Sequence, residues 1–217
     1  MSHQQQVEHM KELARQLSCP DGEEGIKTGE HMNINNAFMT SLTIDSLELL
    51  PGQNVLEIGP GNGRHVNYLL EKYPHVTYQG VDISETMVSE ARRLVRSNQA
   101  HFQLIDGEKL PFADASFDAL YTVNTLYFWK EPLAYAQEMA RCLKPGGKLL
   151  LAFAVKEFME HLPFTQHGFE LYEEETAVEL LQEAGFQIVT TNQQTEEILS
   201  NAGHPVVRTF VLITAQK

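Results

Sequence analysis

One stretch indicates the fold of this 217-residue chain: Val55-Leu56-Glu57-Ile58-Gly59-Pro60-Gly61-Asn62-Gly63. A short apolar run leads into three glycines at alternate positions, and residues 64–70 then have the pattern of a helix start. A strand that ends at a glycine-rich turn and leads into a helix offers backbone N–H groups to a nucleotide. Glycine permits positive φ and lets a ligand approach the backbone closely. The stretch therefore predicts a nucleotide-binding turn.

The spacing of the glycines indicates which kind of nucleotide is bound. A dinucleotide fingerprint has glycines at positions one, three and six. Counted from Gly59, the sixth position is Arg64, so this fingerprint fails. The pattern acid-x-Gly-x-Gly-x-Gly instead resembles the first motif of class I S-adenosylmethionine-dependent methyltransferases.

The composition restricts the partners. The chain carries 16 basic and 29 acidic residues, a formal net charge of −13. This field repels phosphate backbones and anionic lipid, so neither nucleic acid nor a membrane is an expected partner. Cys19 and Cys142 lie far apart and the nine histidines are scattered, so we expect no disulfide framework and no metal site. The first residues lack a signal-peptide pattern and no apolar run is long enough to span a membrane, so a cytoplasmic location is expected.

Strand-like and helical patterns alternate after residue 51. The strand-like runs are Asn54–Ile58, Val76–Val81, Ala100–Ile105, Ala119–Val123, Lys148–Ala154, Phe186–Thr191 and Val206–Ala215. The helical patterns are Arg64–Lys72, Glu85–Arg96, Pro132–Leu143 and Glu173–Ala184. This alternation predicts an α/β fold with a doubly wound, mostly parallel sheet. No helical pattern separates the last two runs, so we expect them to pair antiparallel at one edge.

The first fifty residues lie outside this alternation. Residues 5–17 and 34–50 have helical spacing, and residues 18–30, which are polar and contain three glycines and a proline, predict a mobile loop. We therefore expect a helical extension or lid over residues 1–50 and a nucleotide-binding domain over residues 51–217.

Two aspartates follow strand-like runs at positions that suit an adenosine. Asp82 ends the second run, 21 positions after Gly61, where its carboxylate can accept hydrogen bonds from ribose hydroxyls. Ser84 is the better helix cap, which leaves Asp82 available. Asp106-Gly107 follows the third run and either accepts the adenine amine or simply forms an Asp-Gly turn. Ile83 and Met87 either sandwich the ring or belong to the core.

Later segments strengthen the resemblance. The run Asp106-Gly107-Glu108-Lys109-Leu110-Pro111-Phe112-Ala113-Asp114-Ala115-Ser116-Phe117-Asp118 looks like the Asp-Ala-x-x-Leu-Pro-Phe-x-Asp-x-Ser-Phe-Asp run of small-molecule methyltransferases. Leu143-Lys144-Pro145-Gly146-Gly147-Lys148-Leu149 and Ala184-Gly185-Phe186 are similar to two further motifs of the family. The resemblance spans residues 53–189 and implies a Rossmann-like, seven-stranded sheet with an antiparallel last strand.

The resemblance also implies roles for individual residues. S-adenosylmethionine would be the cofactor and S-adenosylhomocysteine its product. The backbone at Gly59 and Gly61 would face the methionine part, Gly63 would complete the cofactor-binding turn, and Glu57 would orient that turn. Asn124, after the fourth strand-like run, would lie near the sulfonium.

The catalytic residues stay open at this point. Tyr127, in an aromatic run that borders the methyl group in the family, and His31 are candidates, whereas Phe128 and Trp129 are expected to pack. In-line methyl transfer to a small molecule depends more on positioning than on a base, so the accepting atom stays open among oxygen, nitrogen, sulfur and carbon. The alternatives are a nicotinamide-dependent oxidoreductase and a non-catalytic adenosine-binding protein on the same scaffold.

Overall fold

The computed structural model describes residues 2–199 and 204–217, and within them the chain forms one seven-stranded sheet. The strands are β1 Asn54–Ile58, β2 Thr77–Asp82, β3 Ala100–Leu104, β4 Phe117–Val123, β5 Leu143–Ala154, β6 Gln187–Leu199 and β7 Pro205–Gln216. Their order is β3-β2-β1-β4-β5-β7-β6, with β1 to β5 parallel and β7 antiparallel to both of its neighbours. The predicted α/β sheet and its antiparallel edge pair are confirmed.

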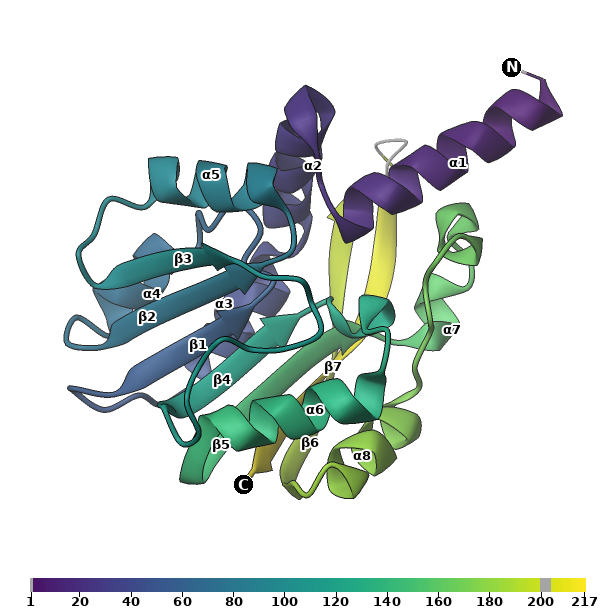
Figure 1. Ribbon diagram of the computed structural model, residues 1–217. Helices are drawn as coiled ribbons and strands as arrows, with labels where there is room; N and C mark the ends of the chain where they lie inside the picture. Colours follow the sequence, from purple (N-terminus) through teal and green to yellow (C-terminus); the bar gives the residue numbers. More distant parts are fainter. Residues whose placement is uncertain (1, 200–203) are drawn as a thin grey trace.

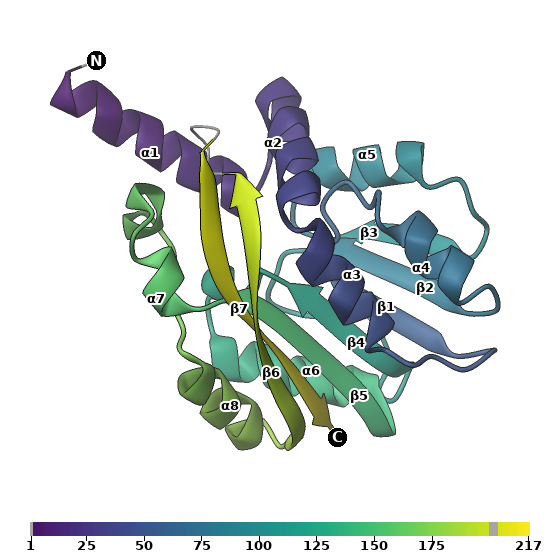
Figure 2. The same ribbon diagram turned by 180° about the vertical axis from the view of Figure 1, so that it is seen from behind.

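Helices cover both faces of the sheet. They are α3 Ala37–Asp45, α4 Val66–Lys72, α5 Glu85–Leu94, α6 Pro132–Cys142 and α8 Glu174–Glu183. Helices α6 and α8 lie in front of the sheet in Figure 1, and α3 and α4 lie in front in the reverse view of Figure 2. Residues 149–154 of β5 are all buried because the strand is covered on both sides, which explains its continuous apolar sequence.

The N-terminal segment is more helical than expected. Helix α1 spans His3–Ser18 and α2 spans Gly22–Asn35, so the loop predicted over residues 18–30 is wrong. A Cβ at Gly25 would lie 2.7 Å from the Pro20 carbonyl carbon, and one at Gly29 would lie 2.7 Å from Met87 Sδ. The glycines therefore permit close packing, and this packing outweighs their low helix propensity. The helix expected over 34–50 is also shorter, because Asn36 separates α2 from α3.

The C-terminal hairpin is longer than its sequence suggests. Pairing between β5 and β7 ends at Ala154 and Phe210, whereas β6 and β7 stay paired out to Leu199 and Pro205. The extended part of this hairpin reaches toward α1 and α2 (Figures 1 and 2). Helix α7, Lys156–Met159, and the 3-10 helix η2, Pro163–Gln166, precede α8, and η2 packs against α1. Three separate segments thus meet beside the carboxyl end of the sheet.

Candidate functional site

A cavity of about 190 Å³ lies where β1, β2 and β4 end, beneath α2. The carboxyl edge of a parallel sheet is the ordinary location of a ligand site in this architecture. Nine of the ten residues predicted to bind a cofactor line this first cavity: Glu57, Gly59, Gly61, Asp82, Ile83, Met87, Asp106, Gly107 and Asn124. The fold thus brings together residues that are as much as 67 positions apart in the chain.

The glycine turn, residues 59–63, bends tightly at the end of β1. Gly59, Gly61 and Gly63 have φ values of +73°, +55° and +65°, which strain any residue with a side chain. The Gly59 N–H donates to the Val81 carbonyl at 2.8 Å, which joins the turn to β2. A Cβ at Gly61 would meet no described atom within 4 Å, whereas one at Gly63 would lie 3.1 Å from both Ala91 and Phe102. Gly61 is therefore open to a ligand, while Gly63 packs inside the fold and lies outside the described lining.

Asp82 is buried at the wall of the first cavity and is only 7% exposed. Its Oδ2 accepts from the Gly61 N–H at 3.0 Å and its Oδ1 from the Ser84 N–H at 2.9 Å. Ser84 caps α5 by accepting from the Met87 N–H at 3.0 Å. A carboxylate has about four acceptor positions, so Asp82 can still accept two ligand hydroxyls. Burial raises the pKa of Asp82 to about 6, and the backbone donors only partly offset that effect.

Asn62 supplies a donor that needs a partner. It is 4% exposed, and its Oδ1 accepts from the Arg64 N–H at 3.2 Å. Its Nδ2 has no hydrogen-bond partner among the described residues, although it lies in the lining of the first cavity. A buried, unpaired donor is unfavourable, so a polar ligand that accepts from Asn62 would remove this cost.

Glu57 lies at the centre of a buried polar cluster under the glycine turn. Its Oε2 accepts from the hydroxyls of Tyr121, at 2.7 Å, and Tyr78. His65 Nε2 lies 2.9 Å from both Glu57 oxygens and belongs to the cavity lining. Burial, and secondarily the charge of Glu57, raises the pKa of both tyrosines well above the ordinary value, so both stay protonated donors. The cluster holds the Glu57 carboxylate in one orientation beside the turn.

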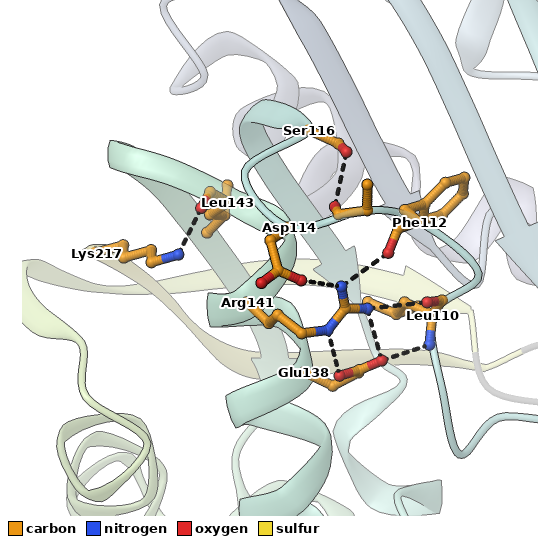
Figure 3. A network of polar contacts seen from close by, with 9 residues as sticks. Leu110, Phe112, Asp114, Ser116, Glu138, Arg141, Leu143 and Lys217 are labelled. Carbon is orange, nitrogen blue, oxygen red and sulfur yellow. Dashed lines mark hydrogen bonds and ion pairs between the residues drawn. The ribbon is translucent and has the colours of Figure 1, made fainter.

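The loop that carries Asp106 and Gly107 is held from behind by α6. Arg141 Nη1 donates to the Phe112 carbonyl at 2.8 Å and Nη2 to the Leu110 carbonyl at 3.0 Å (Figure 3). The planar guanidinium presents its donors in a fixed fork, so Arg141 holds both carbonyls in a defined geometry. Asp106 itself accepts from the Glu108 N–H at 2.9 Å, and these backbone donors lower its pKa.

Asn124 connects the sheet to the N-terminal helices. It has a φ of +58°, a conformation that asparagine tolerates better than most residues. Its Nδ2 donates to Asn36 Oδ1 at 3.1 Å, and its Oδ1 accepts from the Tyr127 hydroxyl and the Ala154 N–H, both at 3.1 Å. Asn124 thereby lies between the sheet edge and the junction of α2 with α3.

The aromatic run after β4 is divided between two cavities. Phe128 and Trp129, expected to pack only, line the first cavity, and the Trp129 indole donates to Thr125 Oγ1 at 3.1 Å. Tyr127 is 3% exposed and lies in the lining of a second, adjoining cavity of about 190 Å³ together with the exposed His31. The two catalytic candidates thus meet around the second cavity rather than the first.

The N-terminal segment is attached to the loop that follows Asp82. Ser84 Oγ donates to the Pro20 carbonyl, and the Gly22 N–H donates to Thr86 Oγ1 at 3.2 Å. Gly29 and Met32 of α2 contribute to the lining of the first cavity. The segment therefore covers the cavity from the side opposite the sheet.

Known proteins share this arrangement. Residues 56–151 match the profile of the family described as a methyltransferase domain, a segment that runs from the strand before the glycine turn into β5. Residues 56–151 therefore form a methyltransferase domain of this family.

Relatives of this chain include proteins of differing length. Phosphoethanolamine N-methyltransferase 1 from Triticum aestivum is 32% identical over 165 residues, which cover 72% of this chain and 32% of the relative. O-methyltransferase resE from Aspergillus sclerotiorum is 29% identical over 177 residues, which cover 74% of this chain and 64% of the relative. The chain thus spans about a third of the length of the wheat protein and somewhat less than two thirds of the fungal one.

Solved structures share the methyltransferase fold. A putative methyltransferase from Bacillus halodurans has a TM-score of 0.68 at 18% identity, covering 82% of this chain and 97% of that one. Phosphoethanolamine N-methyltransferase 2 from Haemonchus contortus has a TM-score of 0.70 at 16% identity, covering 88% and 57%. In the described part of this chain, no helix has the length and apolar character needed to cross a membrane.

Several residues around the methyltransferase site were not indicated by sequence patterns. Asn62 lies within the glycine turn at a position that the motif does not specify, and His65 follows two positions after the turn. Asn36 and Arg208 come from segments far from the motifs, and Arg208 Nη1 donates to Asn36 Oδ1 at 2.9 Å. A polar residue between two glycines was a usable signal for Asn62, but the Asn36 contact depends on the tertiary fold alone.

Proposed function

We propose that this chain binds S-adenosylmethionine in the first cavity and transfers its methyl group to a small molecule. The observation that carries the proposal is the buried Asp82 carboxylate, which is joined to the open Gly61 and retains two acceptor positions toward the cavity. Ribose presents two hydroxyl donors, which match those positions.

The residues present fit such a cofactor. The orphaned Nδ2 of Asn62 and the bare backbone at Gly61 suit a carboxylate-bearing chain, and Asp82 suits the ribose. Ile83, Met87, Asp106 and Gly107 are assigned to the adenine and Glu57 and Gly59 to the methionine part. When bound, S-adenosylmethionine supplies a methyl carbon to which the acceptor lone pair bonds as the carbon–sulfur bond breaks and its electrons stay on sulfur.

The protein's own contribution is mainly positioning. Alignment of reactants can supply about 7–11 kcal/mol, whereas a general base adds about 10²–10⁴-fold in rate. We assign residues 1–50 the role of a lid that excludes water from residues 51–217, because α2 covers the first cavity. His31 is assigned as the base for a protonated acceptor. Tyr127 is assigned a positioning role, because its hydroxyl donates to Asn124 and to the Ala154 carbonyl and burial raises its pKa far above 10.

The names of the relatives indicate two classes of methyl acceptor. The wheat protein is named for phosphoethanolamine and the fungal protein for an oxygen acceptor. The Haemonchus contortus structure contains phosphomonomethylethanolamine and S-adenosylhomocysteine. A nicotinamide-dependent oxidoreductase is not favoured, because Arg64 occupies the third glycine position of its fingerprint.

Calorimetry and turnover test the proposal. We expect S-adenosylhomocysteine to bind with micromolar affinity and NADH not to bind at the same concentrations. Labelled S-adenosylmethionine mixed with a cell extract should then yield a labelled small molecule. Binding without any transfer would favour the non-catalytic adenosine-binding alternative, and NADH binding would favour the oxidoreductase.

A further inference from the structure

The second cavity adjoins the first. Both have a volume of about 190 Å³. Five residues line both of them: Leu17, Met32, Asn36, Asn124 and Phe128. A molecule in the second cavity therefore lies directly beside a molecule in the first.

One part of the lining of the second cavity is aromatic. Phe128 and Phe169 meet edge to face with ring centroids 4.6 Å apart, and Phe164 lies 5.5 Å from Phe169. Tyr127 adds a fourth ring, 5.8 Å from Phe169. Such a surface attracts apolar groups and presents ring edges and faces to another ring.

Further apolar lining comes from two other elements. Leu13 belongs to α1, and Ile198 and Val206 belong to the extended hairpin of β6 and β7. The N-terminal helix and the hairpin thus add apolar side chains to the cavity beside the aromatic rings.

The second cavity offers no free charge to a charged acceptor. In the described lining, Arg208 is the one residue with a permanent charge, and no aspartate or glutamate is present. The Arg208 guanidinium donates to Glu196 from Nε and Nη2, to the Asn35 carbonyl from Nη2 and to Asn36 Oδ1 from Nη1. A phosphate would find no unpaired cation there and an ammonium no carboxylate, so burial of either would be unfavourable.

The polar atoms gather where the two cavities meet. Asn36 and Asn124 are joined by a hydrogen bond of 3.1 Å at this border, and His31 lies at the exposed rim. A bound molecule would therefore direct its polar end toward the first cavity and its apolar body toward the aromatic rings.

We propose that the methyl acceptor is an uncharged, predominantly apolar ring compound whose one polar end lies against Asn36 and Asn124. That end carries the accepting oxygen or nitrogen. This assignment rests on the proposed function, because it names the acceptor for a methyl donor held in the first cavity.

Calorimetric titration of the protein saturated with S-adenosylhomocysteine tests the assignment. The probes are 2-naphthol, which is uncharged at neutral pH, and phosphoethanolamine. We expect 2-naphthol to bind and phosphoethanolamine not to bind. If S-adenosylhomocysteine itself does not bind, the proposed function fails and this assignment with it. If S-adenosylhomocysteine binds and phosphoethanolamine binds in place of 2-naphthol, only the acceptor assignment is overturned.

Two pairs of variants show whether 2-naphthol occupies the second cavity. Leu13→Asp and His9→Asp each add one negative charge to α1, but His9 is exposed and outside the described lining. We expect Leu13→Asp to weaken 2-naphthol binding at least about tenfold and His9→Asp to leave it unchanged. Phe169→Leu should weaken 2-naphthol binding about twofold to tenfold. The control is Phe112→Leu, which changes an equally half-buried ring that packs on Phe117, and we expect it to leave 2-naphthol binding unchanged. Affinities of Leu13→Asp and Phe169→Leu equal to those of their controls would overturn the assignment.

Discussion

At the scale of the residue, Asp82 has a structural role beside its proposed binding role. Its two oxygens hold the glycine turn and the start of α5 through the N–H groups of Gly61 and Ser84. Burial raises the pKa of Asp82 to about 6, some two units above that of an exposed aspartate. The residue is therefore ionised at neutral pH but becomes protonated in mildly acidic solution.

We expect the affinity for S-adenosylhomocysteine to fall as the pH drops through 6. Ribose hydroxyls donate best to the ionised carboxylate, and with a pKa of about 6 only about a tenth of the molecules are ionised at about pH 5. Calorimetry should show about tenfold weaker binding at about pH 5 than at about pH 8. Asp82→Asn should weaken binding about 10- to 100-fold at the higher pH and remove this pH dependence.

The Asp82→Asn variant is also the control for other titrating groups. His65, which faces Glu57 in the same cavity, is unchanged in the variant. Any pH dependence that remains arises from groups other than Asp82. Wild-type affinity in Asp82→Asn at the higher pH would mean that the ribose is held elsewhere.

At the scale of the element, the glycines of α2 permit close contact with neighbouring residues and do not make the helix flexible. Gly29 lies against Met87, which is fully buried at the start of α5. Gly25 lies equally close to Pro20. Because the helix backbone approaches both neighbours closely, α2 is held down over the first cavity.

Gly29→Leu should move α2 away from the first cavity. A Cβ there already lies 2.7 Å from Met87 Sδ, and a larger side chain forced into a packed site costs about 1–3 kcal/mol. We expect affinity for S-adenosylhomocysteine to fall about tenfold in calorimetry. Lys27→Leu is the matched control, because it places the same side chain on the exposed side of the same helix. Equal affinities in the two variants would show that α2 does not shape the site.

At the scale of the whole molecule, a buried ion pair and the hydrogen bonds around it join elements from both ends of the chain. Arg208 of β7 and Glu196 of β6 have side chains that are 7% and 9% exposed and lie 2.7 Å apart. Arg208 also donates to the Asn35 carbonyl and to Asn36, which in turn bonds Asn124 at the end of β4. The lid, the hairpin and the sheet thereby share one polar cluster.

Glu196→Gln should lower the stability of the whole molecule. Removal of one partner leaves the Arg208 charge buried without its counter-ion, which costs about 3–5 kcal/mol. Urea unfolding should show this loss, whereas a double variant with Glu196→Leu and Arg208→Met should regain most of it because no charge stays buried. A loss below about 1 kcal/mol in Glu196→Gln would mean that solvent reaches the pair.

The features of this protein that depend on residues close together in the chain could be predicted from the sequence alone. The strand, the glycine turn and the following helix are consecutive, and the 21-residue interval to Asp82 places the carboxylate on the neighbouring strand. Alternation of strand and helix patterns then sufficed for the parallel sheet and its antiparallel edge. These features follow from backbone geometry, periodicity and the short, right-handed connections between parallel strands.

The position of α2 over the first cavity and the second cavity itself depend on the tertiary structure. A glycine-rich segment has a weak helical signal, and α2 forms because Gly25 and Gly29 can pack against Pro20 and Met87. The polar residues 192–197 lack a strand pattern, yet they pair along β7 and bring Glu196 to Arg208. The hydrogen bond between Arg208 and Asn36 could not be predicted from either segment. It forms because the tertiary fold brings the two residues together, and the sequence around each of them has no periodic pattern that indicates its partner.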